Sequence, residues 1–204
     1  MQIQCDCGSV KAELKNLPQN TPGRCVCYCT DCQTFAHHLG RTELLDEAGG
    51  TEIIPVYPVD MKIQAGEELL RCVRLSPKGL FRWYTSCCKT PMGNTTPGFP
   101  WIGLNGVIVE RDESKRAQFF GEIKSRIEGK GAIKTPPAGT SMKTSFKDLW
   151  VILPFLLKGF IGKKMKVSPY FMANGETPVK TPQIMPLEER NRIRETILQS
   201  RSKN

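Results

Sequence analysis

Cysteine is the residue type in this sequence whose number and spacing most clearly predict chemistry. The chain has 204 residues and nine cysteines. One of them, Cys72, stands alone in a strand-like segment and is interpreted as a small buried apolar side chain. The others fall into three short clusters: Cys5 and Cys7; Cys25, Cys27, Cys29 and Cys32; Cys87 and Cys88.

The spacing within the clusters is typical of metal ligands. Cys29 and Cys32 have the C-x-x-C spacing with which two thiolates reach one tetrahedral ion. A C-x-C step occurs in the first cluster and in the middle one, and Gly8 after the first step permits a sharp turn. Soft thiolate ligands favour zinc among the abundant divalent metals, with iron–sulfur as the chemical alternative. The sequence therefore predicts one or two zinc ions bound by thiolates.

The N-terminal residues favour a reducing compartment. The segment MQIQCDCGSV has no basic region, apolar stretch or cleavage site of a signal peptide. We therefore expect a cytoplasmic protein, in which disulfides are disfavoured and the cysteines bind metal. A redox role for the C-x-x-C pair is disfavoured because no βαβ pattern surrounds it.

The charge balance does not single out one class of anionic partner. The formal net charge is +9, which attracts nucleic acid, anionic membranes or small anions. Because no basic run is interleaved with aromatic residues, we interpret the lysines as solvated and predict no nucleic-acid interface. No transmembrane segment is expected, since the most apolar stretch, 149–161, is broken by Pro154 and Lys158. That stretch is interpreted as a core helix, with an interfacial helix beside its lysines as the alternative.

The elements that must position the cysteines are predicted to be short, mostly antiparallel strands. Residues 1–14 alternate like a hairpin with the first cysteine pair at its turn, and a loop is expected over 16–23. Residues 51–59 form another strand, which Pro55 and Pro58 place at an edge of the sheet. Further strands are predicted over 61–63, 69–75, 80–84 and 101–109.

The chain changes character after about residue 110 and is predicted to become helical. Helices are expected over 111–127, over 144–162 with a kink at Pro154, and over 187–199 after Pro186. The predicted fold class is mainly β, with a zinc-binding domain over 1–110 and a helical C-terminal extension over 111–204 packed on it.

Three cysteine-containing segments, in order, resemble the glutathione-dependent formaldehyde-activating enzyme family, also called the centromere-protein V family. The segments are Cys5-x-Cys7-Gly8, Cys27-x-Cys29-x-x-Cys32 and Cys88-x-Thr90-Pro91. The ordered pattern is specific, although each part alone is weak, and it covers about residues 1–110. The resemblance implies a β-tent fold, in which zinc lies where antiparallel sheets meet.

The resemblance also implies two zinc sites with different roles. A closed structural site would be formed by the outer pairs: Cys5, Cys7, Cys87 and Cys88. A second site with an open coordination position would carry the catalytic ligands: Cys27, Cys29 and Cys32. The implied activity is that of a carbon–sulfur lyase, which makes or breaks the bond between a small thiol such as glutathione and an aldehyde.

The sequence departs from the family pattern at both sites. Thr85 stands where the first cysteine of the third segment is expected. Cys87 is a possible substitute, although two adjacent cysteines give awkward geometry on one ion, and a strained Cys87–Cys88 disulfide is another outcome. Cys25 is an extra thiol that would close the middle site. The alternative function, a non-catalytic zinc-stabilised binding module whose basic tail meets an acidic partner, gains support if Cys25 is a ligand.

Several polar residues near the clusters are candidates for supporting roles, each first interpreted as an ordinary packing, turn or surface residue. His37 or His38 would supply a fourth ligand or carry a proton, and Asp31 would orient the middle site. Thr90 and Asn94 would contact a polar substrate. Three basic residues would attract a carboxylate-bearing thiol: Arg24, Arg41 and Lys89.

Overall fold

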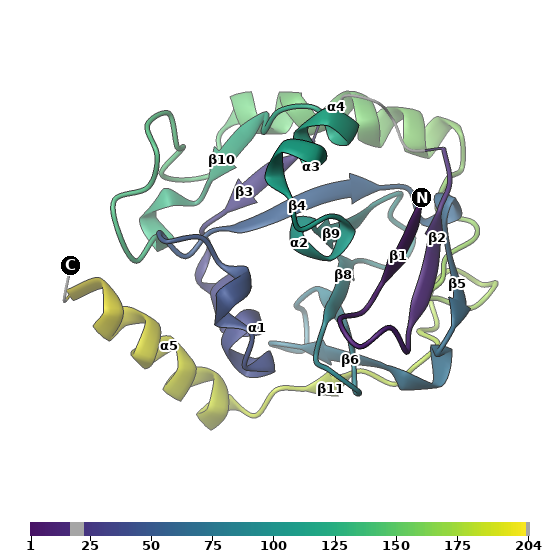
Figure 1. Cartoon of the computed structure of the whole chain (residues 1–204), viewed down its shortest axis with the longest axis horizontal. Helices are drawn as coiled ribbons and strands as arrows, with labels where there is room; N and C mark the ends of the chain where they lie inside the picture. The colour runs from purple at the N-terminus through teal and green to yellow at the C-terminus, as the bar shows by residue number, and fades with distance from the viewer. Residues whose placement is uncertain (17–22, 203–204) are drawn as a thin grey trace.

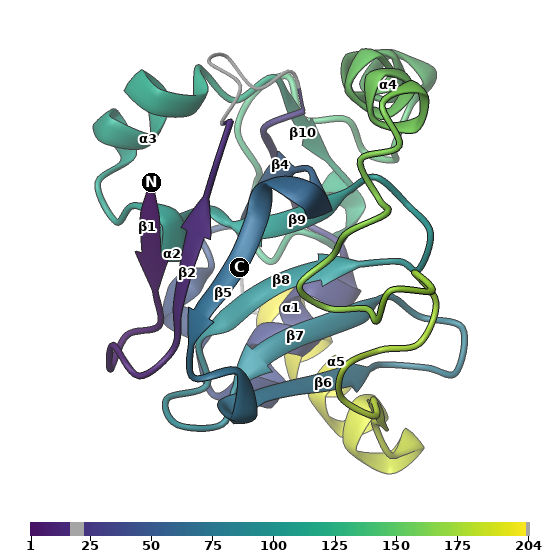
Figure 2. The ribbon, with the colours of Figure 1, turned by 90° about the vertical axis from the view of Figure 1, so that its right-hand side faces the viewer.

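Two sheets of mostly antiparallel strands form the framework of the computed structural model, which describes residues 1–16 and 23–202. The smaller sheet has the strand order β1-β2-β5, and the larger has the order β10-β3-β4-β9-β8-β7-β6-β11. The small sheet stands beside the large one, and the large sheet carries α1 and α5 on one side (Figures 1 and 2). The antiparallel character of the predicted fold is confirmed. The loop predicted over 16–23 lies, apart from its ends, outside the described residues.

The small sheet contains the predicted N-terminal hairpin, which is confirmed. Strands β1 (Gln2–Gln4) and β2 (Lys11–Leu14) pair antiparallel, and β2 pairs in turn with β5 (Met61–Ala65). Between β1 and β2, Gly8 has a φ of 76°, a left-handed conformation that glycine adopts without steric cost. The first cysteine pair therefore sits on a tight turn.

The large sheet supplies most of the core. Its main strands are β3 (Cys25–Cys27), β4 (Thr51–Val56), β6 (Leu70–Arg74), β7 (Phe81–Thr85), β8 (Pro91–Thr95) and β9 (Ile102–Asn105). Every residue of β7, β8 and β9 is buried. The lone cysteine, Cys72, is buried in this core as expected. Trp83 stacks on Tyr170 with ring centroids 4.6 Å apart. Because both faces of the sheet are covered, these strands are buried on both sides rather than at alternate residues.

Strand β4 lies inside the large sheet, so its predicted edge position is wrong. It pairs with β3 on one side and β9 on the other. Strand β3 pairs only as far as Ile53, and Pro55 lies beyond that point, opposite Gly103 of β9. Among the described residues, Pro55 therefore has a strand neighbour on one side only, which is the condition under which a sheet accommodates proline.

Two predicted elements end earlier than their apolar patterns suggested. The strand predicted over 101–109 ends at Asn105, whose side chain accepts a hydrogen bond from the Val107 N–H and caps α2 (Gly106–Val109). The helix predicted over 111–127 is α3 (Glu113–Phe120), which ends at Gly121. The residues after it form the short strand β10 (Ser125–Ile127).

Two of the remaining helices follow the predictions more closely: α4 (Phe146–Ile161), which contains Pro154, and α5 (Leu187–Ser202), which follows Pro186. Helix α1 (Thr30–Leu39), which comes directly after β3, was not predicted. The part of the chain that the structure describes also contains four short 3₁₀ helices: η1 (Thr42–Leu44), η2 (Pro58–Asp60), η3 (Glu67–Leu69) and η4 (Gly129–Gly131). In the described ranges, none of the helices has the length and apolar character needed to cross a bilayer.

The C-terminal part of the chain completes the large sheet at both edges. Strand β10 pairs in parallel with β3, and β11 (Gln183–Ile184) pairs in parallel with β6. Met185 is buried together with Phe35 and Leu39 of α1. The helical segments after residue 110 are thus fastened to the β framework by strand pairing as well as by packing, and the domain boundary at 110 stays a prediction.

A buried ion triad joins α3 to β4. The Glu52 carboxylate accepts hydrogen bonds from the Arg24 Nε at 2.7 Å and from the Arg116 Nε at 2.9 Å. Arg24 and Arg116 are both buried. Removing a single partner from such a group leaves uncompensated charge away from water, which is costly.

We expect Glu52→Gln to lower the free energy of unfolding by about 3–5 kcal/mol, because two buried guanidinium groups lose their counter-charge. Urea denaturation followed by circular dichroism measures the change. The matched control is Glu67→Gln at an exposed position, which should stay within about 0.5 kcal/mol of wild type. Equal stability of the two variants would contradict the importance of the triad.

Candidate metal centres

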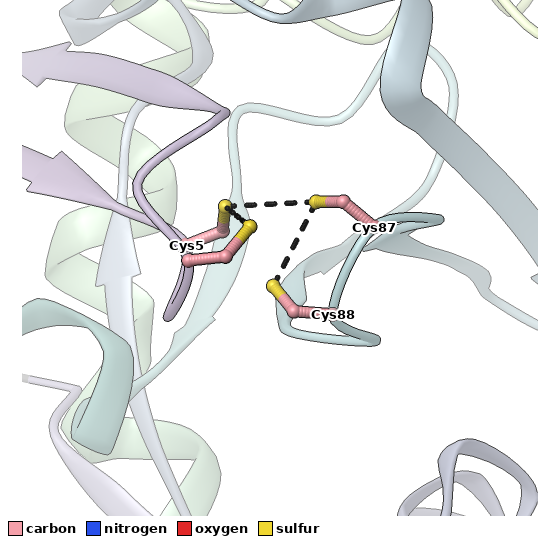
Figure 3. A group of neighbouring side chains, drawn as sticks. Cys5, Cys87 and Cys88 are labelled. Atoms are coloured by element: carbon pink, nitrogen blue, oxygen red, sulfur yellow. Dashed lines mark hydrogen bonds between the residues drawn. The ribbon is translucent and has the colours of Figure 1, made fainter.

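Two turns that are distant in sequence bring four cysteines together: Cys5 and Cys7 of the first hairpin, and Cys87 and Cys88 after β7. Figure 3 labels three of them, Cys5, Cys87 and Cys88. The four Sγ atoms all lie within 4.8 Å of one another. The Cys5 Sγ is 3.5 Å from that of Cys7 and 3.8 Å from that of Cys87, and the Cys87 and Cys88 sulfurs are 3.7 Å apart. A tetrahedral site with Zn–S bonds of about 2.3 Å needs sulfurs about 3.8 Å apart. The donor set and its spacing therefore fit zinc.

Both adjacent cysteines belong to this group, so the awkward geometry expected for Cys87 and Cys88 does not arise. The chain makes a tight turn here: the Lys89 N–H donates to the Thr85 carbonyl at 2.9 Å, and Lys89 has a φ of 57°. The turn directs both sulfurs toward the first hairpin (Figure 3). All nine cysteines, each within the described residues, are free, so the disulfide alternative is not adopted.

Thr85, which occupies the position of the expected cysteine, supports the group through Cys88. The Cys88 Sγ lies 3.4 Å from the Thr85 Oγ1 and 3.2 Å from the Thr90 Oγ1. Burial raises the pKa of Cys88, but hydrogen bonds from Thr85, Thr90 and Cys7 together outweigh it and lower the value to about 5. Burial raises the pKa of Cys5 to about 12. A cation would supply the opposite charge that a buried Cys5 thiolate requires.

Asp6 and two arginines hold the turns around this group in place. The Asp6 N–H donates to the Thr90 Oγ1 at 3.1 Å. Its carboxylate accepts hydrogen bonds from Arg41 at 2.5 Å and Arg111 at 2.6 Å. Arg41 also donates to the Cys88 carbonyl at 3.1 Å. Arg41 and Thr90, predicted as candidate substrate contacts, therefore serve here to fasten one cysteine turn to the other.

The second group consists of Cys27, Cys29 and Cys32, whose Sγ atoms also lie within 4.8 Å of one another. Cys27 ends β3, and Cys29 is the N-cap of α1, where its Sγ accepts a hydrogen bond from the Cys32 N–H at 3.4 Å. Three thiols thus meet at the N-terminus of a helix, where the helix dipole and free N–H groups favour negative charge.

The loop between β3 and α1 is braced by a segment far along the chain. The Gln33 side-chain amide donates to the carbonyls of Tyr28 and Gly131, each at 2.7 Å. A Cβ on Gly131 would lie 2.1 Å from the Tyr28 carbonyl oxygen, so only glycine permits this approach. The C-terminal half of the chain therefore fixes the geometry of the three-thiol group.

Cys25 lies outside the three-thiol group. It precedes Cys27 by two positions on β3, so the two side chains share a face but their Cα atoms are roughly 6.6 Å apart. Burial raises the pKa of Cys25 to about 12, which favours the neutral thiol. Cys25 instead forms part of the wall of the neighbouring cavity.

A cavity of about 530 Å³ opens beside the three-thiol group. The three cysteines line it together with Trp101, which comes just before β9, and with apolar residues of α4, among them Ile152 and Leu156. Asn94 and Asp31, two of the predicted candidates, also line it. The site therefore combines thiol ligands with an apolar space large enough for a small molecule.

The other predicted candidates are engaged elsewhere. His38 makes a 2.7 Å hydrogen bond to Glu189 of α5, and burial lowers the pKa of His37. Neither belongs to the possible metal-binding groups found among residues 1–16 and 23–202. Arg24 is buried in the triad with Glu52, and the Lys89 amine lies 5.4 Å from the centre of the Tyr84 ring.

Arg82 is a site residue that the sequence analysis missed. It is buried in β7, lines the cavity and donates to the Asn94 Oδ1 at 3.4 Å. The thiols of Cys27 and Cys29, followed by the Arg82 guanidinium, lower the pKa of Cys32. The sequence does contain a signal for this residue, an arginine inside an otherwise apolar predicted strand. A buried cation requires a compensating anion, so such an arginine indicates an anionic group nearby.

The fold and the two groups define a mainly antiparallel β protein with two thiol-rich candidate metal centres. The chain belongs to the family of unknown function DUF6151, whose profile matches residues 1–181. It is also similar to a Rhodobacter sphaeroides protein whose crystal structure comes from structural genomics, with a TM-score of 0.43 and 19% identity over 60% of this chain and 97% of that one. No curated protein matches the chain.

We expect the purified protein to contain about two zinc ions per chain, one for each group of thiols. Cys88→Ser and Cys29→Ser should each remove one ion, because each takes a thiolate from a different group. Elemental analysis of the purified variants measures this. Cys25→Ser is the matched control and should keep both ions; loss of one ion from this variant would mean that Cys25 closes the middle site.

Proposed function

We propose that the protein is a zinc-dependent carbon–sulfur lyase-like enzyme that acts on the adduct of a small thiol, such as glutathione, with an aldehyde. The observation that carries the proposal is the three-thiol group at the wall of a cavity, with Cys25 outside it. Structural zinc sites use four protein ligands, whereas catalytic sites use three and keep a position for water or substrate. The ordered cysteine segments that resemble the formaldehyde-activating family support the same assignment.

The chain supplies a charge environment suited to a thiolate. Zinc held by Cys27, Cys29 and Cys32 would supply a Lewis acid that lowers the pKa of a substrate thiol. Three thiolates on a divalent ion leave a net negative charge, and the buried Arg82 guanidinium beside Cys32 offsets it. Asn94, which accepts a hydrogen bond from Arg82, keeps that guanidinium oriented at the cavity wall.

The proposed reaction is balanced without an oxidant or a reductant. In cleavage, the carbon–sulfur bond of the hydroxyalkyl thioether breaks and its electron pair goes to sulfur. The hydroxyl proton leaves as the aldehyde carbonyl forms, and addition is the reverse. Two carboxylates line the cavity, Asp31 and Asp148. Asp148 accepts two hydrogen bonds from Ser145 in the capping box of α4, whereas the half-exposed Asp31 accepts one, from Arg194 to its Oδ1, so we assign the other carboxylate oxygen of Asp31 as the proton acceptor.

The lining of the cavity favours a substrate with an apolar part. Helix α4 contributes Leu149, Val151, Ile152 and Leu156 to the wall; β4 contributes Ile53, and Trp101 comes from the connection before β9. An apolar wall of this kind stabilises a hydrocarbon group by removing it from water. We therefore propose an aldehyde that carries an apolar substituent in addition to the thiol partner.

The alternative, a non-catalytic module with a basic tail for an acidic partner, has less support. Three arginines of α5 contact this chain itself. Arg190 donates to the Leu75 carbonyl at 2.9 Å, Arg194 to Asp31 at 2.6 Å, and Arg201 to the Gly131 carbonyl at 2.5 Å. These contacts hold the tail against α1, η4 and the end of β6 rather than presenting its charge to a partner.

We expect the zinc-loaded protein to accelerate the breakdown of glutathione–aldehyde adducts, and kcat/KM to rise with the length of an alkyl substituent. Release of the aldehyde and of the free thiol, monitored spectroscopically, measures the rate. Cys29→Ser should lower kcat/KM by about 100-fold, because it removes a ligand of the open site. Cys25→Ser, which alters the wall alone, should keep most of the activity.

Two results would contradict the proposed function. One is a zinc-loaded wild-type protein that leaves the adduct lifetime unchanged for every aldehyde. The other is equal rates for wild type and Cys29→Ser, which would place any activity outside the three-thiol group.

A further inference from the structure

Helix α4 is anchored to the molecule by one side only. Phe155 is buried and stacks on Tyr57, with ring centroids 4.1 Å apart and planes 7° from parallel. The Tyr57 hydroxyl donates to the Phe155 carbonyl at 2.9 Å. A Cβ on Gly159 would lie 2.7 Å from Pro100, so the helix backbone approaches the loop closely there. These contacts fix which side of α4 faces outward.

The outward side of α4 is a stripe of large apolar side chains. Phe146 is 84% exposed, Trp150 69%, Leu157 52% and Ile161 82%. These residues are four, seven and four positions apart, and at roughly 100° per residue they fall on one face. We call these four residues the outer stripe. Soluble monomers rarely expose contiguous apolar surface of this kind unless it serves an interaction.

Lysines border the outer stripe, and acidic residues are nearly absent from this part of the sequence. Residues 143–167 contain six lysines and a single acid, Asp148, whose carboxylate is held in the capping box. Lys147 and Lys158 lie on the same flank of α4, and Lys163 and Lys166 follow its end; all four are exposed. An exposed apolar stripe with a basic border and a tryptophan is typical of helices that lie at an anionic membrane surface.

We propose that the outer stripe docks on an anionic lipid bilayer, with its apolar side chains at headgroup level and the lysines against the lipid charges. The helix lies in the plane of the surface, in keeping with the absence of any spanning helix among the described residues. A second copy of the chain is a poorer occupant, because an isologous contact through this stripe would bring the same lysines together. This proposal does not depend on the zinc chemistry proposed above.

Tryptophan fluorescence reports the docking directly. Of the three tryptophans, Trp83 is fully buried and Trp101 is half-buried, whereas Trp150 is exposed in the outer stripe. Mixing the full-length protein with vesicles of phosphatidylcholine and phosphatidylserine should shift the emission to shorter wavelength. Trp150→Phe should still sediment with these vesicles but lose the shift, because phenylalanine keeps the apolar contact.

Co-sedimentation supplies the quantitative test. Binding to mixed phosphatidylcholine and phosphatidylserine vesicles should be about tenfold or more above binding to phosphatidylcholine alone, and should fall with added salt. Trp150→Glu should lower it by about tenfold, and so should Lys147→Glu combined with Lys158→Glu. The matched control is Leu198→Glu, at a position of α5 that is 53% exposed, and it should bind like wild type.

Three results would overturn the proposal. The first is equal sedimentation with neutral and anionic vesicles. The second is equal loss of binding in Leu198→Glu and Trp150→Glu. The third is a concentration-dependent dimer in solution that Trp150→Glu dissociates, because the stripe would then be covered by a second copy. All the substituted positions are exposed, so circular dichroism spectra matching wild type should accompany each measurement.

Discussion

The architecture depends on four thiols that come from two different sheets, one pair from the turn between β1 and β2 and the other from the turn between β7 and β8. Cys5 and Cys87 are separated by 82 positions, yet their sulfurs lie 3.8 Å apart. Four thiolates at this spacing repel one another unless a cation lies between them. The attraction between thiolates and cation would therefore both form the site and join the two turns. Asp6, with Arg41 and Arg111 on its carboxylate, surrounds the junction with compensating charges.

The three-thiol group relies on the rest of the chain in a different way. Its ligands are close in sequence, but the loop that carries them is held by β10, by Gly131 and by arginines of α5. Helix α4 then forms a wall of the adjoining cavity. The segment after residue 110 therefore shapes the candidate site, and the family match, which reaches residue 181, includes α4.

The sequence predicted what local spacing determines. The middle cysteine group, the first hairpin and helices α4 and α5 follow from ligand spacing, alternation and capping residues, which act over a few positions. The outer cysteine group joins pairs that are 82 positions apart, and only the resemblance to a family pattern predicted it. Strands β10 and β11 escaped prediction because segments of three and two residues are recruited by the edge they pair with. The interior position of β4 and the burial of Arg82 depend on partners distant in sequence, which no local pattern encodes.

The different spans of the two thiol groups impose an order on assembly during synthesis. The ligands of the middle group are all present once residue 32 has left the ribosome, and closing so short a loop costs little entropy. The outer group stays incomplete until residue 88 emerges, so its first pair must wait as exposed thiols while the strands between are made. The nascent chain would therefore hold all the ligands for a first ion long before the two sheets are joined, whereas a second ion would bind only as a late step that depends on correct closure of the framework.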